Sequence, residues 1–298
     1  MLLDVSKNSS YKSCSSFRAR LVMVFSFLMV SSLFIAITGF FETFIGYLLL
    51  GTNPSLLICS AVFFVTFSTY SLNKLTDVEE DAINMPERSN FLTGHRRLVI
   101  LSILAGYVLC VLLVFLAKPL AIPILFVPLA AGFLYSIKLH PVIPRLKDIP
   151  VMKSITVAFS ASCVCTLLPA VNSTDVAKVT IASVFYFVLV KVFIDATLYD
   201  VRDIEGDKAT GIRTIPVLIG TRKTTVLLLA INSTILPCVV LVEIGIRPLA
   251  ILMIFYGYAY ILYFRKRRNP MTLDFFVDGQ WMLASIMFIM LKGVRVII

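Results

Sequence analysis

The sequence is poor in charged residues. Only 15% of its 298 residues are charged, whereas 59% are hydrophobic and the mean hydropathy is +0.94. Soluble domains are about half apolar and a quarter charged, so this balance excludes an ordinary soluble protein. It favours a chain that crosses a membrane many times.

The sequence also lacks paired cysteines, and we expect no cleaved leader. Its six cysteines show no C-x-x-C spacing and fall mostly in apolar stretches, so we interpret them as packing residues. Cys163 and Cys165 could be read as a redox or metal pair, but alternate positions on one helix point about 200° apart. The apolar run after Arg20 is about twice as long as a signal-peptide core and has no A-x-A end, so we expect it to be kept.

Long apolar runs separated by short charged stretches predict an all-α integral membrane protein. A helix of about 20 residues crosses the hydrocarbon layer, whereas a barrel would show short alternating segments. We predict nine transmembrane helices, the first of them one tilted helix or a broken one. Their expected ranges are 21–50, 54–72, 97–117, 119–137, 153–171, 176–199, 223–243, 246–264 and 275–297.

The net charge of +10 does not indicate a nucleic-acid partner, because of where the basic residues lie. Most of the 27 Lys and Arg residues fall in the N-terminal tail and in the loops after the second, fourth, sixth and eighth spans. Basic loops stay on the cytoplasmic side of a membrane. We therefore expect a multi-pass cell-membrane protein whose N-terminus and four charged loops are cytoplasmic and whose C-terminus is outside. The basic cluster 265–268 is first an orientation signal, and contact with membrane lipid is the lesser alternative.

More than half of the 17 acidic residues lie in two segments that follow the second and sixth spans. The first segment has the pattern Asn73-x3-Asp77-x3-Asp81. If the span continues as a helix, steps of four residues keep these side chains on one face. The same chemistry therefore recurs on successive turns at one end of a span.

The second segment has the spacing Asp200-x2-Asp203-x3-Asp207, which also places its carboxylates on one face. Like charges at this spacing repel one another, and a cation would reverse that cost. Oxygen ligands without His or Cys favour Mg²⁺ or Mn²⁺, and Mg²⁺ is usually held by one or two carboxylates plus substrate phosphates. Two such motifs predict a diphosphate held through metal ions. The alternative is that these are solvated charges at helix ends.

A bound diphosphate also needs cations from the same loops. Fixed Lys and Arg side chains stabilise charge on a departing diphosphate. For any single residue, a topology signal is the plainer interpretation. The candidates are Lys74, Arg88, Lys138, Arg145, Lys147, Lys153, Arg202, Lys208 and Arg213.

Each motif is followed by residues that interrupt a helix, Pro86 after the first and Gly206, Gly211 and Pro216 after the second. Each half of the chain thus has a span, an acidic helix end, a broken segment and another span. This arrangement hints at an internal duplication, although no residue-level repeat extends beyond the motifs.

The two motifs, in this order and at the ends of spans, resemble those of the UbiA superfamily of intramembrane prenyltransferases. The resemblance rests on the nine-span layout, on Asn73-x3-Asp77-x3-Asp81 with Asn84-x-Pro86-x-Arg88 behind it, and on Asp203-x3-Asp207 continuing into Gly211-x-Arg213-Thr214-x-Pro216-Val217. The first motif is most similar to archaeal members, including those related to digeranylgeranylglyceryl phosphate synthase. The chain departs from the family at Lys74, often Asp, and at Ser89, where Pro is frequent.

The resemblance implies nine helices around a central cavity with cytoplasmic cap loops, in one membrane-embedded domain over residues 1–298. Its N-terminal half would carry motif 73–81 and its C-terminal half motif 200–207. The implied activity is Mg²⁺-dependent transfer of a prenyl group from a prenyl diphosphate, such as geranylgeranyl diphosphate. The implied acceptor is lipid-soluble, either an aromatic quinone precursor or a glyceryl phosphate.

The resemblance also implies roles for the motif residues. Asp77 and Asp81 would hold one Mg²⁺, Asp203 and Asp207 a second, and Asn73 would hydrogen-bond the diphosphate. Neutralising the diphosphate would let the allylic bond break towards a carbocation, in a cavity that excludes water. Asp200 would be a further ligand or base.

The rival class is a polytopic ion-coupled transporter. Acidic and basic residues inside a span, such as Lys191 and Asp195, mark ion pathways in such proteins. The acidic residues here gather at one end of the spans, whereas transporter sites lie near the midplane. A CDP-alcohol phosphotransferase is a second alternative, but its D-x2-D-G-x2-A-R pattern is absent.

Overall fold

The computed structural model describes residues 24, 27–138, 140, 143–171 and 175–292, and every regular element in this part of the chain is helical. The α-helices are α2 (Leu33–Leu49), α3 (Leu56–Thr76), α4 (Val78–Asn84), α5 (Pro86–Gly94), α6 (Arg96–Ala117), α7 (Ile122–Ser136), α8 (Met152–Ser162), α9 (Leu168–Val171), α10 (Lys178–Arg202), α11 (Ile204–Thr210), α12 (Ile215–Ser233), α13 (Arg247–Tyr263), α14 (Pro270–Val277) and α15 (Gly279–Lys292). Shorter segments are η1 (Pro119–Ala121), η2 (Leu146–Asp148), the π-helical η3 (Cys163–Leu167), η4 (Pro237–Val240) and η5 (Ile244–Ile246).

Eight of the described helical stretches are long and apolar enough to cross a membrane. The all-α membrane fold predicted from the sequence is therefore confirmed, but the count of nine is approximate. The first predicted span, 21–50, begins outside the described residues, and its remainder is α2, a shorter apolar helix of 17 residues. A break at Ser32, whose φ is 65°, separates α2 from the helical residues 27–30.

Two further predicted spans begin earlier than expected. The seventh, predicted at 223–243, starts with α12 at Ile215, and the ninth, predicted at 275–297, starts with α14 at Pro270. Gly220, whose φ is 78°, and the polar residues 221–222 separate the apolar start of α12 from the predicted span. The start of α14 follows the basic cluster and contains Asp274, which lowers its hydropathy. Proline stands in the first turn of each helix, and the Asn269 side chain caps α14 by accepting from the Met271 backbone N–H at 2.9 Å.

The outward face of the bundle is apolar. On α6, for example, Leu101, Val108 and Leu116 are each more than half exposed, and Phe255 on α13 is similarly exposed. A soluble protein would not leave such faces in water, whereas lipid tails accept them. Together with the eight apolar stretches, this surface makes the chain a multi-pass membrane protein.

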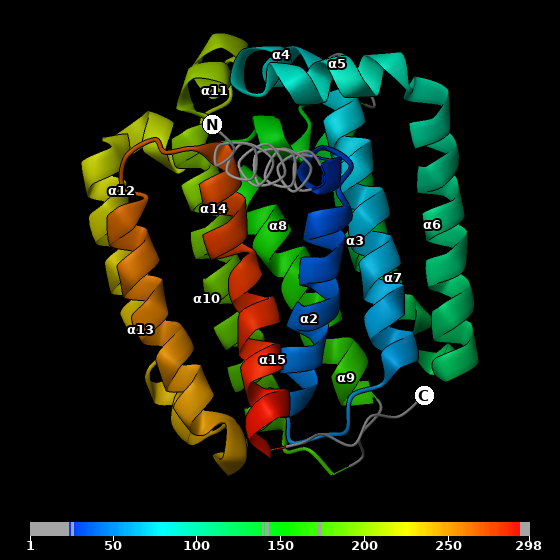
Figure 1. Cartoon of the computed structure of the whole chain (residues 1–298), viewed down its shortest axis with the longest axis vertical. Helices are drawn as coiled ribbons and strands as arrows, with labels where there is room; N and C mark the ends of the chain where they lie inside the picture. Colours follow the sequence, from blue (N-terminus) through cyan, green and yellow to red (C-terminus); the bar gives the residue numbers. More distant parts are fainter. Residues whose placement is uncertain (1–23, 25–26, 139, 141–142, 172–174, 293–298) are drawn as a thin grey trace, which may run out of the picture.

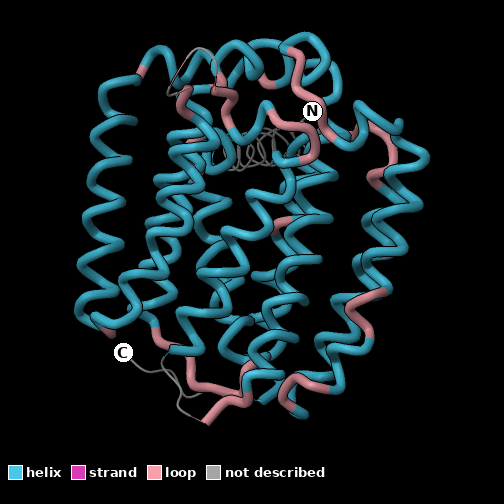
Figure 2. The backbone as a smooth tube through the Cα atoms, turned by 180° about the vertical axis from the view of Figure 1, so that it is seen from behind, coloured by secondary structure: helices cyan, strands magenta, loops and turns pink. Residues whose placement is uncertain are grey.

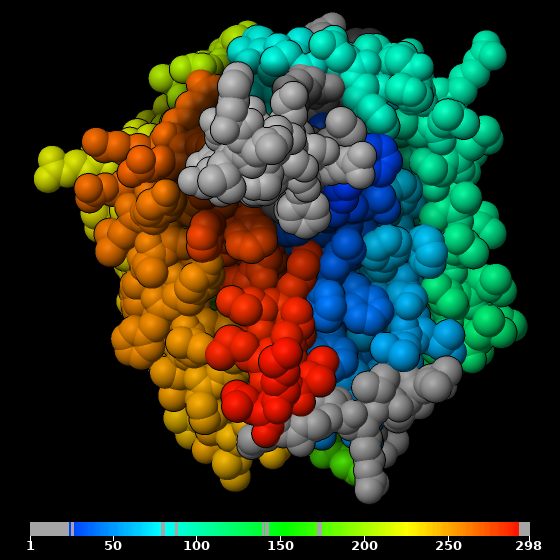
Figure 3. All heavy atoms as spheres, in the orientation of Figure 1, coloured from blue at the N-terminus to red at the C-terminus, as the bar shows by residue number. Residues whose placement is uncertain are grey.

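The long helices stand side by side, and one end of the bundle is capped by α4, α5 and α11 (Figure 1). We call this the capped end. Seen from behind, most irregular segments gather at the two ends of the bundle, and a few short breaks interrupt the helices between them (Figure 2). In the space-filling view, α15 (red) lies against α2 (blue) and α13 (orange) on the front face (Figure 3).

The two acidic segments have the same backbone arrangement. Asp77 joins α3 to α4 with φ −102° and ψ 22°, and Asp203 joins α10 to α11 with φ −97° and ψ 9°. In each case the helix axis turns at the middle aspartate, but the backbone hydrogen bonds continue through the turn. The backbone N–H of Asp77 donates to the Asn73 carbonyl, and that of Asp203 donates to the Tyr199 carbonyl, both at 3.0 Å. Each span thus ends in a short cap helix that continues its acidic face over the end of the bundle.

The closest helix contact near the cavity depends on a glycine. A Cβ at Gly46 of α2 would stand 2.0 Å from the carbonyl oxygen of Cys165 in the π-helical segment. Because that atom belongs to the backbone, it has little room to move. We expect Gly46→Ala to destabilise the protein by about 1–3 kcal/mol, the cost of overpacking. The midpoint of thermal unfolding in detergent measures this loss.

Gly94→Ala is the matched control, because a Cβ there meets nothing within 4 Å. This variant should unfold at or slightly above the wild-type temperature, since Ala favours helix over Gly. Equal unfolding midpoints for the two variants would contradict the close approach of α2 to the π-helical segment.

Candidate functional site

A cavity of about 260 Å³ lies among the helices below the capped end. Both acidic motifs contribute to its wall, although more than a hundred residues separate them in the sequence. The motif residues lining it are Asn73, Asp77, Asp81, Asp200, Asp203 and Asp207. The two stretches therefore face one space, as a shared binding site requires.

In the first motif, Asp77 and Asp81 are both buried, at 8% and 4% exposure. The ammonium of Lys147, itself buried, forms an ion pair with the Asp77 carboxylate. Asn73 accepts a 3.4 Å hydrogen bond from Ser136 at the end of α7. Helices α3, α4 and α7 and the loop before α8 thus converge on this half of the site.

In the second motif, one lysine links two carboxylates. Lys153 Nζ lies 3.2 Å from Asp200 Oδ1 and 2.8 Å from Asp207 Oδ1. Ser154 Oγ donates to the other Asp200 oxygen at 2.6 Å. Burial raises the pKa of Asp207 to about 7, although the Lys153 ammonium acts in the opposite direction.

Asp203 is held by its neighbour in the chain. Arg202 donates to both carboxylate oxygens, from Nε at 2.7 Å and from Nη2 at 2.8 Å, which is a bidentate pair. The same guanidinium reaches Asp274 of α14 at 3.5 Å. Most motif carboxylates at the capped end therefore form ion pairs with Lys or Arg side chains of the same chain.

The two cap helices are locked together by one amide. The Gly206 backbone N–H donates to Asn84 Oδ1 at 3.1 Å, and Asn84 Nδ2 donates to the Asp203 carbonyl at 3.5 Å. A Cβ at Gly206 would stand 2.2 Å from the Asn84 amide nitrogen, so only glycine permits this approach. The contact fixes α4 against α11 and hence one motif against the other.

The predicted basic residues separate into three groups. Lys74, Lys153 and Arg202 line the cavity, and Lys147 reaches it through Asp77. The backbone of Arg88 lies in α5, but its side chain is outside the described part of the structure. The remaining candidates are not among the lining residues: Arg145 pairs with Asp148, and Lys138, Lys208 and Arg213 are exposed.

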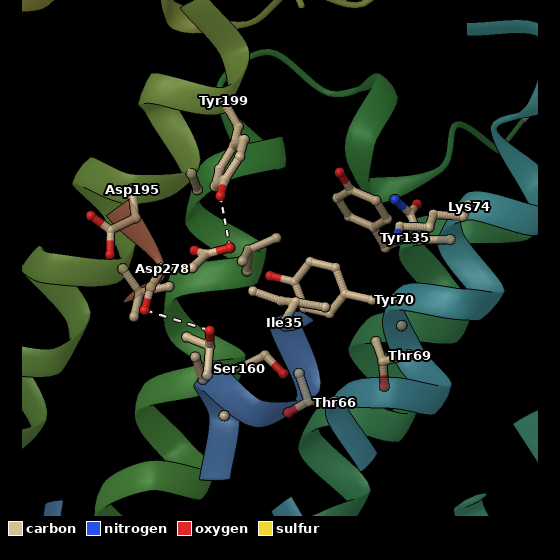
Figure 4. A pocket seen from close by; sticks show the side chains of 18 of the residues that line it. Ile35, Thr66, Thr69, Tyr70, Lys74, Tyr135, Ser160, Asp195, Tyr199 and Asp278 are labelled. Carbon is tan, nitrogen blue, oxygen red and sulfur yellow. Dashed lines mark hydrogen bonds between the residues drawn. The ribbon is translucent and has the colours of Figure 1, made fainter. Parts of the chain in front are cut away.

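The sequence predictions missed several side chains of the cavity. Tyr70 and Tyr135 lie across from Asp195, Tyr199 and Asp278 in Figure 4. A tyrosine in an apolar run gives no signal that separates a cavity wall from lipid contact. Ser154 and Asn84 gave equally little signal of their contacts.

Acids within spans gave a stronger signal. Glu42 and Asp278 also line the cavity, and each is an acid within a hydrophobic stretch, which marks a functional position in membrane helices. Lys191 and Asp195 lie four residues apart on α10, a spacing that allows direct pairing. In the structure Tyr260 stands between them, accepting from Lys191 at 2.9 Å and donating to Asp195 at 2.8 Å.

The donor set suits a hard divalent cation. Among the described residues, no three carboxylate, thiol or imidazole groups converge on one point to form a complete protein cage. Mg²⁺ does not require one, because it is commonly held by one or two carboxylates together with substrate phosphates and water. Asp77 with Asp81, and Asp203 with Asp207, supply carboxylates to one cavity from opposite sides, so the residues present fit Mg²⁺.

Comparison with known proteins finds a matching family and several related proteins. The model of a family described as "UbiA prenyltransferase family" matches residues 22–286. Digeranylgeranylglyceryl phosphate synthase of Methanoculleus marisnigri is 29% identical over 199 residues, which are 63% of this chain and 66% of that protein, just under two thirds of its length. The synthase of the same name from Pyrococcus horikoshii is 27% identical over 214 residues, covering 66% of this chain and 69% of the relative.

Two solved structures share the fold. A UbiA homolog from Archaeoglobus fulgidus bound to GPP and Mg²⁺ superposes with a TM-score of 0.66 at 17% identity, over 89% of this chain and 99% of that one. The apo structure of a UbiA homolog from Aeropyrum pernix K1 gives 0.63 at 16% identity, over 86% and 98% of the two chains. At these identities the likeness concerns the fold.

Proposed function

This chain belongs to the UbiA prenyltransferase family, and we propose that it transfers a prenyl group from a prenyl diphosphate to a lipid-soluble acceptor. The observation that carries the proposal is that two distant acidic motifs line a single buried cavity within an apolar bundle. Such a cavity offers carboxylates at its capped end and, further in, apolar side chains such as Ile35, Val65 and Val192. A prenyl diphosphate has the matching shape, with an anionic head and a hydrocarbon tail.

Two groups of residues would bind the prenyl diphosphate, the motif aspartates through Mg²⁺ and the basic side chains directly. Asp77 and Asp81 on one side, and Asp203 and Asp207 on the other, are the residues that would hold Mg²⁺. When bound, Mg²⁺ supplies positive charge that weakens the bond between the prenyl group and its diphosphate. Lys147, Lys153, Arg202 and Lys74 hold positive charge beside the same space and stabilise the departing diphosphate.

Residues with hydroxyl and amide groups orient the site. Ser154 fixes one oxygen of Asp200, which we propose as a further ligand or base, and Asn73 offers its amide to the diphosphate. Asn84 keeps the two cap helices together. With the caps closed over the apolar cavity, water is kept from the reactive carbon.

We further propose that the capped end faces the cytoplasm, as the positions of the basic loops predict. The N-terminal tail and the last residues, whose sides of the membrane were also predicted, lie outside the described residues. Two metal ions, one for each motif, follow from the matched geometry of Asp77 and Asp203. The transporter alternative is not favoured by the family match or the similar structures.

The proposal is tested by following radiolabelled geranylgeranyl diphosphate in purified protein without any ion gradient. The acceptor panel should contain a phenol, a naphthoquinone precursor and a glyceryl phosphate ether. We expect Mg²⁺-dependent formation of one prenylated product, loss of turnover in EDTA and its return with added Mg²⁺. Turnover that persists in EDTA would remove the metal from the proposal, and unchanged donor with every acceptor and metal would contradict prenyl transfer.

A further inference from the structure

A second set of acids lines the cavity deeper in the bundle. Glu42 of α2, Asp195 of α10 and Asp278 between α14 and α15 are all buried lining residues, and we call them the acidic floor. Asp195 lies five residues before Asp200 on one helix, so it is about 7.5 Å further from the capped end at 1.5 Å per residue. In Figure 4, Asp195 and Asp278 occupy one wall and Tyr70 faces them. The floor is therefore separate from the motif carboxylates.

Two of the floor carboxylates already have hydrogen-bond donors. Asp195 accepts from Tyr260 at 2.8 Å and from Gln280 Nε2 at 3.1 Å. Asp278 accepts from Tyr199 at 2.7 Å. These bonds hold both carboxylates in place at the edge of the cavity.

Glu42 differs from the other two acids. Its side chain is only 6% exposed, it lines the cavity, and its Oε1 has no hydrogen-bond partner among the described residues. Thr156, across the bundle on α8, also lines the cavity and also has a buried hydroxyl with no partner. Buried polar atoms are nearly always satisfied, because leaving one unpaired costs free energy. Two open polar atoms on one cavity indicate a ligand that carries polar groups.

The helices beside the floor are irregular where they meet it. Asp278 stands at the break between α14 and α15, within a stretch that otherwise spans the membrane. Val164 and Cys165, in the π-helical segment, also line the cavity. Broken helices and π segments inside membranes are tolerated where they face protein or a cavity, and they recur at binding sites.

The charge of the floor limits what can bind there. The neighbouring ammonium, Lys191 Nζ, donates to the Met253 carbonyl at 3.2 Å and to Tyr260, and Lys191 is not a lining residue. Three acids therefore face the cavity without a lysine between them and the ligand. An anionic group bound there would lose its hydration without gaining a cation, which is costly in this poorly solvated space. A bare prenyl tail would leave the open oxygen of Glu42 unsatisfied.

We infer that the acidic floor binds an uncharged, hydroxyl-bearing part of the prenyl acceptor, with Glu42 accepting its hydrogen bond. A hydroxyl suits either open atom, because it can donate to Glu42 and accept from Thr156, whereas a cation could only satisfy the first. The description of the ligand as an acceptor rests on the proposed function. The chemistry of the site does not rest on that function, because it follows from the unpaired atoms of Glu42 and Thr156 and from the absence, among the described residues, of a lysine between the floor acids and the ligand.

The only tryptophan of the chain reports on this site directly. Trp281 of α15 is buried and lines the cavity three residues after Asp278. Its fluorescence can be titrated in nanodiscs without donor or metal. The probes are 1-O-octylglycerol, which has an uncharged diol head, and octyl phosphate, which has an anionic head on the same chain. We expect a saturable change with the diol and a dissociation constant at least about tenfold weaker for the phosphate.

The variants are Glu42→Leu and, as a matched control, Glu243→Leu, at a residue that lies by a different pocket beside Gly51 and Arg247. Glu42→Leu should weaken diol binding by up to about tenfold, the effect of removing one hydrogen-bond acceptor, while Glu243→Leu should leave it unchanged. A thermal unfolding scan shows whether Glu42→Leu remains folded; if it does not, Thr156→Val, expected to weaken diol binding several-fold, takes its place.

Each outcome decides the question. Equal affinity for the two probes, no saturable change with the diol, or unchanged diol affinity in both Glu42→Leu and Thr156→Val would overturn the inference. A normal titration in a protein that never consumes a prenyl diphosphate would instead contradict the proposed function and leave the floor as a hydroxyl-binding site.

Discussion

Asp77→Asn and Asp203→Asn are each expected to lower the rate of prenyl transfer by at least about 10²–10³-fold, the usual cost of removing one group that stabilises a developing charge. Asparagine keeps the size and polarity of aspartate but removes the negative charge that a divalent cation needs. Both side chains line the cavity at the junction of a span with its cap helix. Initial rates at saturating Mg²⁺ and donor measure the effect.

Glu205→Gln is the control for these variants. Glu205 lies two residues after Asp203 in the same acidic segment, but its side chain is 69% exposed, pairs with Arg267 and is not a lining residue. It should retain full activity. If Asp77→Asn and Asp203→Asn insert and purify like the wild type and also transfer prenyl groups at its rate, the proposed metal role of both motifs is wrong.

Lys153→Met is expected to destabilise the metal-free protein by about 3–5 kcal/mol, because it leaves buried carboxylates without their partner. Lys153 Nζ is within 3.2 Å of both Asp200 and Asp207, whose side chains are each 2% exposed. The loss should appear as a lower thermal unfolding midpoint in EDTA. The loss should shrink as the pH falls towards about 7, the pKa of Asp207 beside Lys153, because without the ammonium this carboxyl is protonated at a higher pH and then needs no cation.

Added Mg²⁺ should raise the unfolding midpoint of Lys153→Met more than that of the wild type. A ligand that binds only the folded protein stabilises it, and in this variant two carboxylates are no longer held by the lysine. Lys208→Met is the control, since Lys208 is exposed on α11 outside the cavity. An identical Mg²⁺ response in all three proteins would show that Asp200 and Asp207 do not take part in metal binding.

The sequence was sufficient to locate the two motifs because their spacing matches the helical repeat at the ends of two apolar spans. Asn73, Asp77 and Asp81 do line one cavity, even though the helix turns at Asp77, because the backbone hydrogen bonds continue through the turn. The family resemblance stated from these residues is confirmed by the family match. Local periodicity and hydropathy therefore carried most of the prediction.

The partners of the carboxylates could not be predicted from the sequence. The loop before α8 contains Arg145 and Lys147, which look equivalent as candidates. In the structure the η2 turn keeps Arg145 with Asp148, at 2.9 Å, and turns Lys147 inward to Asp77. The choice depends on the path of an irregular loop, for which residue spacing gives no rule.

The acidic floor was missed for a different reason. Glu42, Asp195 and Asp278 come from three regions of the chain and share no spacing, so only the packing of α2, α10 and α14 brings them to one cavity. Each was visible as an acid in an apolar run, but a single acid could equally pair with a neighbour. Their common orientation is a property of the folded bundle alone.

The lock between Asn84 and Gly206 has a consequence for how molecules come and go. It joins the two cap helices into a single roof over the carboxylates, and opening that roof would break both hydrogen bonds of the Asn84 amide. A long isoprenoid chain already lies in the hydrocarbon layer of the bilayer, so its path to and from the cavity need not cross the cap helices. The prenylated product would therefore leave sideways between helices into the bilayer, and only the water-soluble diphosphate would require the two cap helices to separate.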